Sequence, residues 1–348
     1  MSDTRVEAKW IANFVDVFRL CGVKAGDACA VLSETQSRPV LVRLAELALA
    51  QIGARWYHVI VPTPLQTAPV PVRSTGASEA IGRLQPVINA LASSVFIADC
   101  SVEGLQHALE LPEILKGGAR VLVVSNEHPE ILERCLPHAA DEATVRDAMR
   151  RLKGARRMQV TSRAGTDLVV ELSGARVGGV WGFTSKPGTL THWPGGLVLA
   201  FPAAGSVNGT LVLDRGDVNL SFKRYLDAAV RLEIADDHIG AIHGAGLDAE
   251  LMRSHLAAWS ANPGDRSAYA VSHVGWGLNR RARWDAMACY DKADFNGTEL
   301  RAFAGNFLYS TGANEVAGRH TLGHFDLPLR GCTVELDGVA VVRDGELV

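Results

Sequence analysis

Three observations predict an α/β N-terminal domain with a parallel sheet, followed by a larger β-rich α+β domain. The chain has 348 residues, enough for two domains, and 47% of them are hydrophobic, enough for two cores. Helical and strand patterns alternate through residues 1–155, which is typical of a parallel sheet covered by helices. In residues 156–348, short strand candidates are separated by Gly, Asp and Pro. We therefore expect the domain boundary within residues 151–157.

Hydrophobic periodicity locates the elements of the first domain. Apolar side chains at helical spacing predict a helix over residues 6–21, which Gly22 can end. Gly53 is expected to cap a second helix, Pro62 to end a strand, and Pro86 to kink or break a helix. The other predicted strands of this domain are 28–32, 56–61, 94–98 and 120–125, and the other predicted helices are 40–51, 77–91, 102–115, 128–136 and 141–152.

The second domain shows a different pattern of short, regularly interrupted strands. One clear helix, over residues 249–260, stands among them, which favours an antiparallel β-rich domain. The predicted strands are 157–161, 168–172, 196–201, 210–213, 231–234 and 334–336.

The parallel sheet of the first domain does not carry the motifs of a nucleotide-binding site. No G-x-G-x-x-G follows the first strand, and no G-x-x-x-x-G-K-[ST] occurs in the chain. A scaffold or oligomerisation role is therefore favoured for this domain.

Composition indicates a cytoplasmic protein that binds neither nucleic acid nor membranes. The net charge of −3 gives no electrostatic reason to expect a polyanionic partner, and no run approaches the roughly 18 apolar residues of a membrane span. The acidic N-terminal segment does not resemble a signal peptide. None of the six cysteines forms a C-x-x-C pair, and most lie in apolar runs, as buried thiols of a reducing compartment do.

A histidine and an aspartate two residues apart, His324 and Asp326, form the most informative motif. If the segment is extended, both side chains point to the same side. They would supply two ligands of a 2-His-1-carboxylate site, which holds Fe(II) and leaves positions open for substrate and oxygen. His273, which lies among small, apolar and aromatic residues, could be the third ligand. Spacing alone leaves open that this histidine is a hydrogen-bonded core residue.

Two further histidines are candidates for the same site. His192 lies in THWPGG at 191–196, which we expect to be a loop before a strand, and it either lines a pocket or has a structural role. His320 is close to His324 and could be a fourth ligand or a loop residue. Common hydrolase motifs offer no alternative, because the sequence contains neither G-x-S-x-G nor H-E-x-x-H.

Several segments resemble the 2,5-dihydroxypyridine 5,6-dioxygenase family, the ring-cleaving enzymes of bacterial nicotinate and nicotine breakdown. The resemblance covers nearly the full length and is strongest after residue 155. The matching segments are SHVGWGL at 272–278, FAGNFLYSTG at 303–312, HFDLPLR at 324–330, SRAGTD at 162–167, HWP at 192–194 and GTLVLD at 209–214.

This resemblance implies one Fe(II) per chain, with His273, His324 and Asp326 as its ligands. Ser310, in the matching YSTG segment, is implied to hydrogen-bond the substrate or a ligand. A two-metal aminopeptidase of the same fold is the alternative, since leucyl-type enzymes also end in an H-x-D motif. Those enzymes use glutamate ligands, whereas this chain has His273 at the first such position and no carboxylate in FPAAGS at 201–206. A single iron therefore fits better.

The resemblance also makes His107 a candidate acid or base. LQHA at 105–108, followed by ILKGG at 114–118, is similar to a family segment in which a histidine precedes a helix. Without the resemblance, His107 is expected to be a surface residue of helix 102–115. The preceding CSVE at 100–103 departs from the more apolar family pattern, so the shape of the substrate pocket does not follow from the resemblance.

The implied reaction opens the C5–C6 bond of 2,5-dihydroxypyridine to N-formylmaleamate and places both atoms of O2 in the product. His107 or His192 would remove a proton from a substrate hydroxyl. The implied partners are thus a small aromatic N-heterocycle and O2, and a homo-oligomer is expected. A dioxygenase for another hydroxypyridine and a non-catalytic relative stay open.

Overall fold

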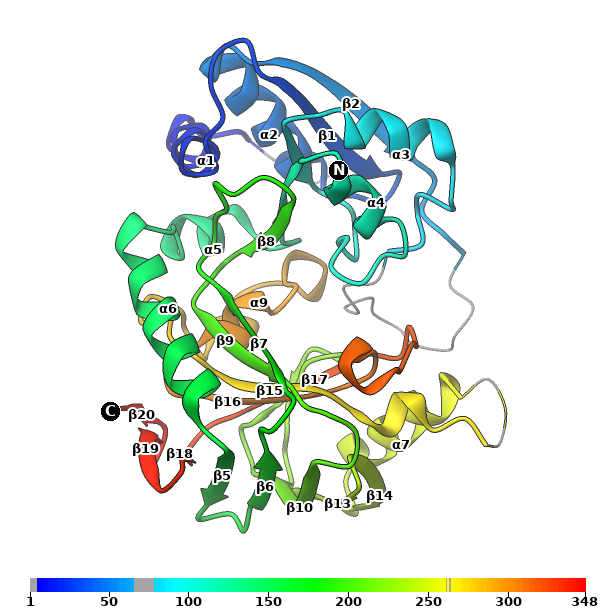
Figure 1. The fold of residues 1–348 in the computed structure, drawn as a ribbon, viewed down its shortest axis with the longest axis vertical. Coiled ribbons are helices and arrows are strands. Elements are labelled where there is room, and N and C mark those ends of the chain that lie inside the picture. Colours follow the sequence, from blue (N-terminus) through cyan, green and yellow to red (C-terminus); the bar gives the residue numbers. More distant parts are fainter. Residues whose placement is uncertain (1–4, 66–77, 261, 263) are drawn as a thin grey trace.

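In the computed structural model, a parallel sheet with its helices lies above a central region and the antiparallel strands lie below it (Figure 1). The structure describes residues 5–65, 78–260, 262 and 264–348. Residues 1–4, which belong to the acidic N-terminal segment, lie outside the described residues. Residue 77, the expected start of a helix, also lies outside them. A parallel sheet with helices precedes a larger antiparallel β-rich part, which confirms the predicted fold class.

The first part is built on a five-stranded sheet in the order β2-β1-β3-β4-β8, and every neighbouring pair is parallel. Its strands are β1 (Ala28–Glu34), β2 (Arg55–Val61), β3 (Phe96–Asp99), β4 (Arg120–Val124) and β8 (Thr189–Trp193). The ends of β1 to β4 lie within two residues of the predicted strand ends, and β8 was not predicted.

Helices cover both faces of this sheet. One apolar core packs α1 and α2 against one face, and a second packs α3 and α4 against the other. No helix within the described ranges combines the length and the apolar character that a bilayer crossing requires. The helices are α1 (Ala8–Leu20), α2 (Pro39–Ile52), α3 (Gln85–Ala92), α4 (Leu111–Lys116), α5 (Pro129–Arg134) and α6 (Ala139–Gly154).

The fifth strand, β8, comes from residues beyond 155. The chain leaves the first sheet after β4, contributes strands to the second part, and returns to pair β8 in parallel with β4. The division into domains at residues 155 and 156 stays a prediction, and this strand crosses it.

Two predicted helices are shorter than expected. The helix expected at 77–91 begins only at Gln85, because Gly82 and Arg83 have φ values of 58° and 56° and Pro86 occupies the first turn. The helix expected at 102–115 begins only at Leu111. There, Asp99 accepts hydrogen bonds from the amides of Ser101 and Leu105, which holds residues 100–110 in turns instead.

The β-rich part contains an eight-stranded and a five-stranded antiparallel sheet. The orders are β14-β13-β10-β6-β5-β18-β19-β20 and β17-β16-β15-β9-β7. The strands of the first are β5 (Arg157–Ser162), β6 (Asp167–Glu171), β10 (Val207–Leu213), β13 (Val230–Ala235), β14 (His238–His243), β18 (Cys332–Leu336), β19 (Val339–Arg343) and β20 (Glu346–Leu347). Those of the second are β7 (Arg176–Val180), β9 (Leu197–Phe201), β15 (Val271–Gly277), β16 (Phe307–Thr311) and β17 (Phe325–Leu329).

A single large core joins these two sheets, and three short helices complete this part. Burial alternates along β13, whereas every residue of β15, β16 and β17 is buried. The remaining helices are α7 (Leu247–Ala258), α8 (Ala286–Cys289) and α9 (Thr298–Ala302), and a two-stranded ribbon joins β11 (Val218–Asn219) to β12 (Arg224–Tyr225).

The centre of the five-stranded sheet is packed too tightly for a side chain at Gly275. A Cβ atom there would lie 1.9 Å from the carbonyl oxygen of Val198 on the neighbouring strand. We expect Gly275→Ala to lower the free energy of unfolding by about 3 kcal/mol, because β9 and β15 must move apart. Urea denaturation measures this change. Gly338→Ala provides the contrast for a glycine with open space around it, although its φ of 83° adds some strain.

Candidate metal centre

Three adjacent strands bring the predicted ligands together. His273 on β15 pairs with Ser310 on β16, and Ser310 pairs with Asp326 on β17. Residues opposite each other on neighbouring strands share a face of the sheet, so these three side chains point the same way. His324 immediately precedes β17, two residues before Asp326, and joins them on that face.

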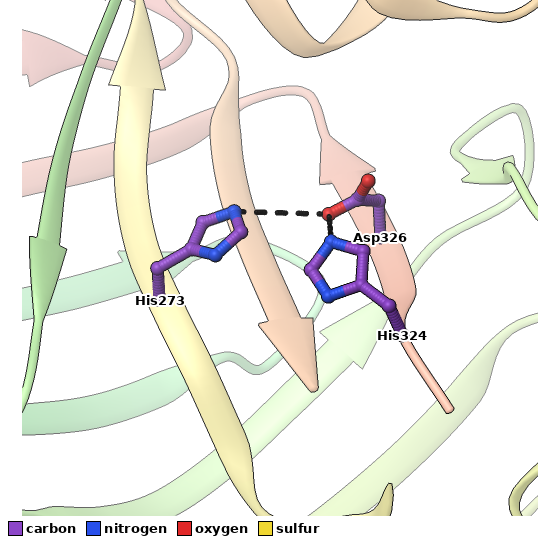
Figure 2. Close-up of side chains that lie close together, drawn as sticks. All are labelled: His273, His324 and Asp326. Carbon is purple, nitrogen blue, oxygen red and sulfur yellow. Dashed lines mark ion pairs between the residues drawn. The ribbon is translucent and has the colours of Figure 1, made fainter. Parts of the chain in front are cut away.

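The donor atoms of His273, His324 and Asp326 converge on one point. The Nε2 atoms of His273 and His324 lie 3.8 Å and 3.1 Å from Oδ1 of Asp326, and Figure 2 shows both rings directed at this oxygen. One donor atom from each of the three residues lies within 4.8 Å of the others. All three side chains are buried. Two imidazoles and one carboxylate in this arrangement are the donor set of a 2-His-1-carboxylate metal site.

Two members of this group are in the protonation state that binds a metal. Burial lowers the pKa of His273 to about 3, so its imidazole is neutral at pH 7. Burial alone would raise the pKa of Asp326, but the neighbouring His324 and Arg301 outweigh it and hold the pKa well below its usual range. Metal ligands must be deprotonated, and a neutral imidazole beside an ionised carboxylate meets that requirement.

Hydrogen bonds orient the ring of His273. Ser272 Oγ donates to the carbonyl oxygen of Ala313 at 2.6 Å and lies 3.1 Å from Nδ1 of His273. Because the serine proton is already used, Nδ1–H donates to Ser272 Oγ and the lone pair is on Nε2. His324 Nδ1 is buried and has no hydrogen-bond partner among the described residues. The contact of His273 with Ser272 is thus of the kind that ligating histidines typically make through their second nitrogen, whereas His324 has no such contact among the described residues.

Asp326 is held by two side chains, of which only one was a predicted site residue. Ser310 Oγ donates to Oδ1, so this serine contacts a candidate ligand. Arg301 on α9 donates from Nε to Oδ2 at 2.5 Å. Sequence reasoning missed Arg301, because its neighbours in the chain carry no motif and it reaches Asp326 only through the tertiary fold.

His107 lies beside this group although it belongs to the first part. Its ring centroid is 5.4 Å from that of His324. Burial, and then the nearby His324, lower the pKa of His107 to about 4, so the ring is neutral at pH 7. The expectation of a surface helix position was wrong, since His107 lies in the turns before α4 and is partly buried.

His192 approaches the group from the end of β8. The predicted loop at 191–196 was wrong at this position, because His192 is a strand residue paired with Val123 of β4. Its Nδ1–H donates to the carbonyl oxygen of Pro194 at 2.7 Å, which leaves the lone pair on Nε2. Burial lowers its pKa to about 4, and Arg301 and Asp326 are close enough to contribute smaller shifts.

Aromatic rings and one arginine that we did not predict pack around the histidines. The ring of Phe201 lies 5.4 Å from that of His273, and the guanidinium of Arg176 lies 4.7 Å above Phe201. His255 stacks on Phe325 with the ring centroids 4.8 Å apart. The structure gives His320 no place in the metal-binding group.

Nearly the whole chain is similar to proteins of one family. The model of the family described as 2,5-dihydroxypyridine 5,6-dioxygenase matches residues 9–348. A protein of Pseudomonas putida KT2440 named 2,5-dihydroxypyridine 5,6-dioxygenase is 38% identical over 340 residues, which cover 96% of this chain and 95% of that protein.

Solved structures show the same relationship. The 2,5-dihydroxypyridine dioxygenase of Pseudomonas putida KT2440 superposes with a TM-score of 0.91 at 35% identity, over 99% of this chain and 98% of that one. AmpT of Thermus thermophilus superposes with a TM-score of 0.65 at 14% identity, over 97% and 99% of the chains. The second similarity is one of fold alone.

Proposed function

The chain belongs to the 2,5-dihydroxypyridine 5,6-dioxygenase family, and on this premise we propose that it opens the C5–C6 bond of 2,5-dihydroxypyridine to give N-formylmaleamate. It is a ring-cleaving dioxygenase, and a two-metal aminopeptidase is not favoured. The observation that carries the proposal is the convergence of His273, His324 and Asp326 in one buried group. That group contains a single carboxylate, whereas a two-metal site needs several acidic ligands.

A dioxygenase of this family requires a metal cofactor, and the three residues fit a single ferrous ion. We propose that Nε2 of His273, a ring nitrogen of His324 and a carboxylate oxygen of Asp326 hold it. The support is the donor set, the neutral imidazole of His273 and the ionised carboxylate of Asp326. Bound Fe(II) would supply the redox chemistry that lets O2 react with an electron-rich ring.

The two neighbouring histidines are the proposed acid–base groups. A neutral imidazole can accept the proton of a substrate hydroxyl, and both His107 and His192 are neutral at pH 7. His107 is preferred because its ring centroid lies 5.4 Å from that of His324, where the first part of the molecule approaches the candidate centre. The Nδ1–H bond of His192 to Pro194 leaves Nε2 as its accepting atom, so His192 is the alternative base.

We propose that Ser310 acts by orienting Asp326. Its hydroxyl donates to Oδ1, the same oxygen that faces the two imidazoles. Loss of this bond would let the carboxylate rotate. A hydrogen bond from Ser310 to the substrate is less well supported, since the hydroxyl proton is already used.

We also propose the substrates, the location and the oligomeric state of the enzyme. The substrates are a small hydroxypyridine and O2, and a cytoplasmic location agrees with six free thiols, five of them buried. A homo-oligomer is proposed as well. Sedimentation of the purified protein checks its oligomeric state.

We expect one O2 to be consumed for each 2,5-dihydroxypyridine opened. The ring gains two oxygen atoms in becoming N-formylmaleamate, so both atoms of O2 enter the product and no external reductant is needed. Protein loaded anaerobically with Fe(II) is mixed with substrate, and an oxygen electrode and ring absorbance give the ratio. Isotopically labelled O2 shows where the atoms go.

A panel of other hydroxypyridines and a leucyl peptide serve as controls. Faster oxygen uptake with a different hydroxypyridine would correct the substrate. Leucyl peptide hydrolysis with Zn(II) or Co(II), without oxygen uptake with Fe(II), would contradict the proposed reaction.

A further inference from the structure

A helix of five residues, α9, contacts both the first part of the molecule and the candidate metal centre. Figure 1 shows α9 in the central region, between the parallel sheet and the antiparallel sheets. It carries Arg301, whose guanidinium holds Oδ2 of Asp326. Five residues are too few to form a stable helix alone, so its position must be fixed by its neighbours.

Glu127 provides one of these fixed points from the other part of the molecule. It follows β4, and its side chain is completely buried. Oε2 accepts a hydrogen bond from the amide of Asn296 at 2.8 Å, and Oε1 accepts from the amides of Gly297 and Thr298 at 2.8 Å and 2.7 Å. One carboxylate thus binds three consecutive amides at the start of α9.

The backbone at this start is restricted to one conformation. Gly297 has a φ of 93°, and a Cβ atom there would lie 2.2 Å from Cδ1 of Leu220. Glycine is therefore required for the three amides to face Glu127.

An ion pair with a buried carboxylate holds α9 one residue further on. Arg134 on α5 donates to both oxygens of Glu299, at 3.0 Å and 2.8 Å, and the amide of Arg283 also donates to Glu299 at 2.7 Å. Glu299 is completely buried, like Glu127. Buried carboxylates are costly unless they are fully hydrogen-bonded, so both contacts favour one placement of α9.

A short chain of hydrogen bonds runs from Glu127 to Asp326. Asn296, whose amide binds Glu127, accepts a hydrogen bond on Oδ1 from Nη1 of Arg301 at 3.1 Å. Arg301 then donates from Nε to Asp326. Two residues, Asn296 and Arg301, therefore separate the carboxylate of one part from the carboxylate of the candidate centre in the other.

We propose that Glu127 is a positioning residue of the metal centre, which acts through Asn296 and Arg301 to fix the orientation of the Asp326 carboxylate. This inference rests on the proposed function, in which Asp326 is a metal ligand. It assigns to the first part of the molecule a role in metal affinity, although none of the described residues of that part belongs to the metal-binding group. Residues that orient a ligand typically change metal affinity by 10- to 100-fold when they are replaced.

Glu127→Gln tests the proposal with a side chain of the same shape. Glutamine keeps one accepting oxygen, but its NH2 group can only donate and would face a backbone N–H, so at least one of the three bonds is lost. We expect the dissociation constant of the full-length apoprotein for Co(II) to rise about 10- to 100-fold. The visible absorption of bound Co(II) should also change, because it reports ligand geometry, which a loss of stability alone would not move.

Asp248→Asn is the matched control. Asp248 on α7 is also a buried carboxylate, and its hydrogen bond and ion pair go to Asn219 and Arg224 rather than to α9. We expect it to lower thermal stability while the Co(II) affinity and spectrum stay at the wild-type values.

Asn296→Ala keeps the proposal testable if Glu127→Gln does not fold. Glu127 accepts from backbone amides, which this substitution leaves in place. The substitution removes only the side chain of Asn296, whose Oδ1 accepts from Arg301. Weaker Co(II) binding in Asn296→Ala supports the proposal. Wild-type affinity and spectrum in both variants would overturn it. Wild-type affinity in His273→Ala would instead overturn the proposed metal centre, and the inference with it.

Discussion

Full-length protein carrying His273→Ala is expected to lose its bound metal and its dioxygenase activity while it keeps the wild-type fold. The substitution removes one of three converging donors, and the remaining pair, His324 and Asp326, makes a much weaker site. The backbone of β15 stays paired with β9 and β16, because its ladder does not involve the imidazole. Iron analysis after anaerobic loading, oxygen uptake and circular dichroism measure the three quantities.

His58→Ala is the control for the loss of a largely buried imidazole. His58 lies on β2, an edge strand of the parallel sheet, and contacts Ser33 and Glu46. The candidate centre lies on a different sheet. We expect this variant to lose stability and to keep its iron. Bound iron and full activity in His273→Ala would remove that residue from the site, and the same experiment on His324 and Asp326 tests the other two ligands.

His107→Ala is expected to keep iron at the wild-type level and to lower turnover by about 10² to 10⁴, the usual contribution of a positioned acid or base. The ring is close to His324 but is not one of the three converging donors, so metal binding should not depend on it. If His107 is the acid–base group, its location in the first part implies that substrate binds between that part and the antiparallel sheets. Steady-state oxygen uptake and iron content, measured on the same preparation, separate the two effects.

His192→Ala provides the comparison within the same wall of the site. If His192 is the base instead, its variant will show the large loss in turnover and His107→Ala will lose less than about threefold, well below an acid–base contribution. Equal iron content in both variants is required for this comparison. A loss of iron in His107→Ala would show that the ring supports the metal centre and is not an acid–base group alone.

Local patterns in the sequence predicted most of the fold, and long-range contacts account for what they missed. The helix around Phe14 and Phe18 has a clear helical period and appears as α1, and the short apolar run around Val31 appears as β1. β15, β16 and β17 are buried on both faces and therefore lack the alternation that identifies a strand. The turns that carry His107 depend on the side chain of Asp99, which helical periodicity does not report.

Local sequence likewise predicted some residues of the candidate site, and long-range contacts position the others. His324 and Asp326 could be paired from the sequence, because two residues of an extended segment share a side over a short distance. The apolar surroundings of His273 left its role open between a ligand and a core residue, and the family resemblance favoured the ligand, since its place beside Asp326 depends on the pairing of three strands. Arg301 and Glu127 gave no signal, because each acts through contacts between residues that are far apart in the sequence.

The position of β8 has a consequence for how the chain folds during synthesis. β4 spans Arg120–Val124, but the strand that covers its outer edge, Thr189–Trp193, is made only after β5, β6 and β7 have emerged from the ribosome. Until then, β4 is an open edge of mostly apolar residues, of the kind that other chains can pair with. β5 in turn waits for β18, near the end of the chain. Neither sheet can be completed on its own, so native contacts of high sequence separation must form late and together, which slows folding.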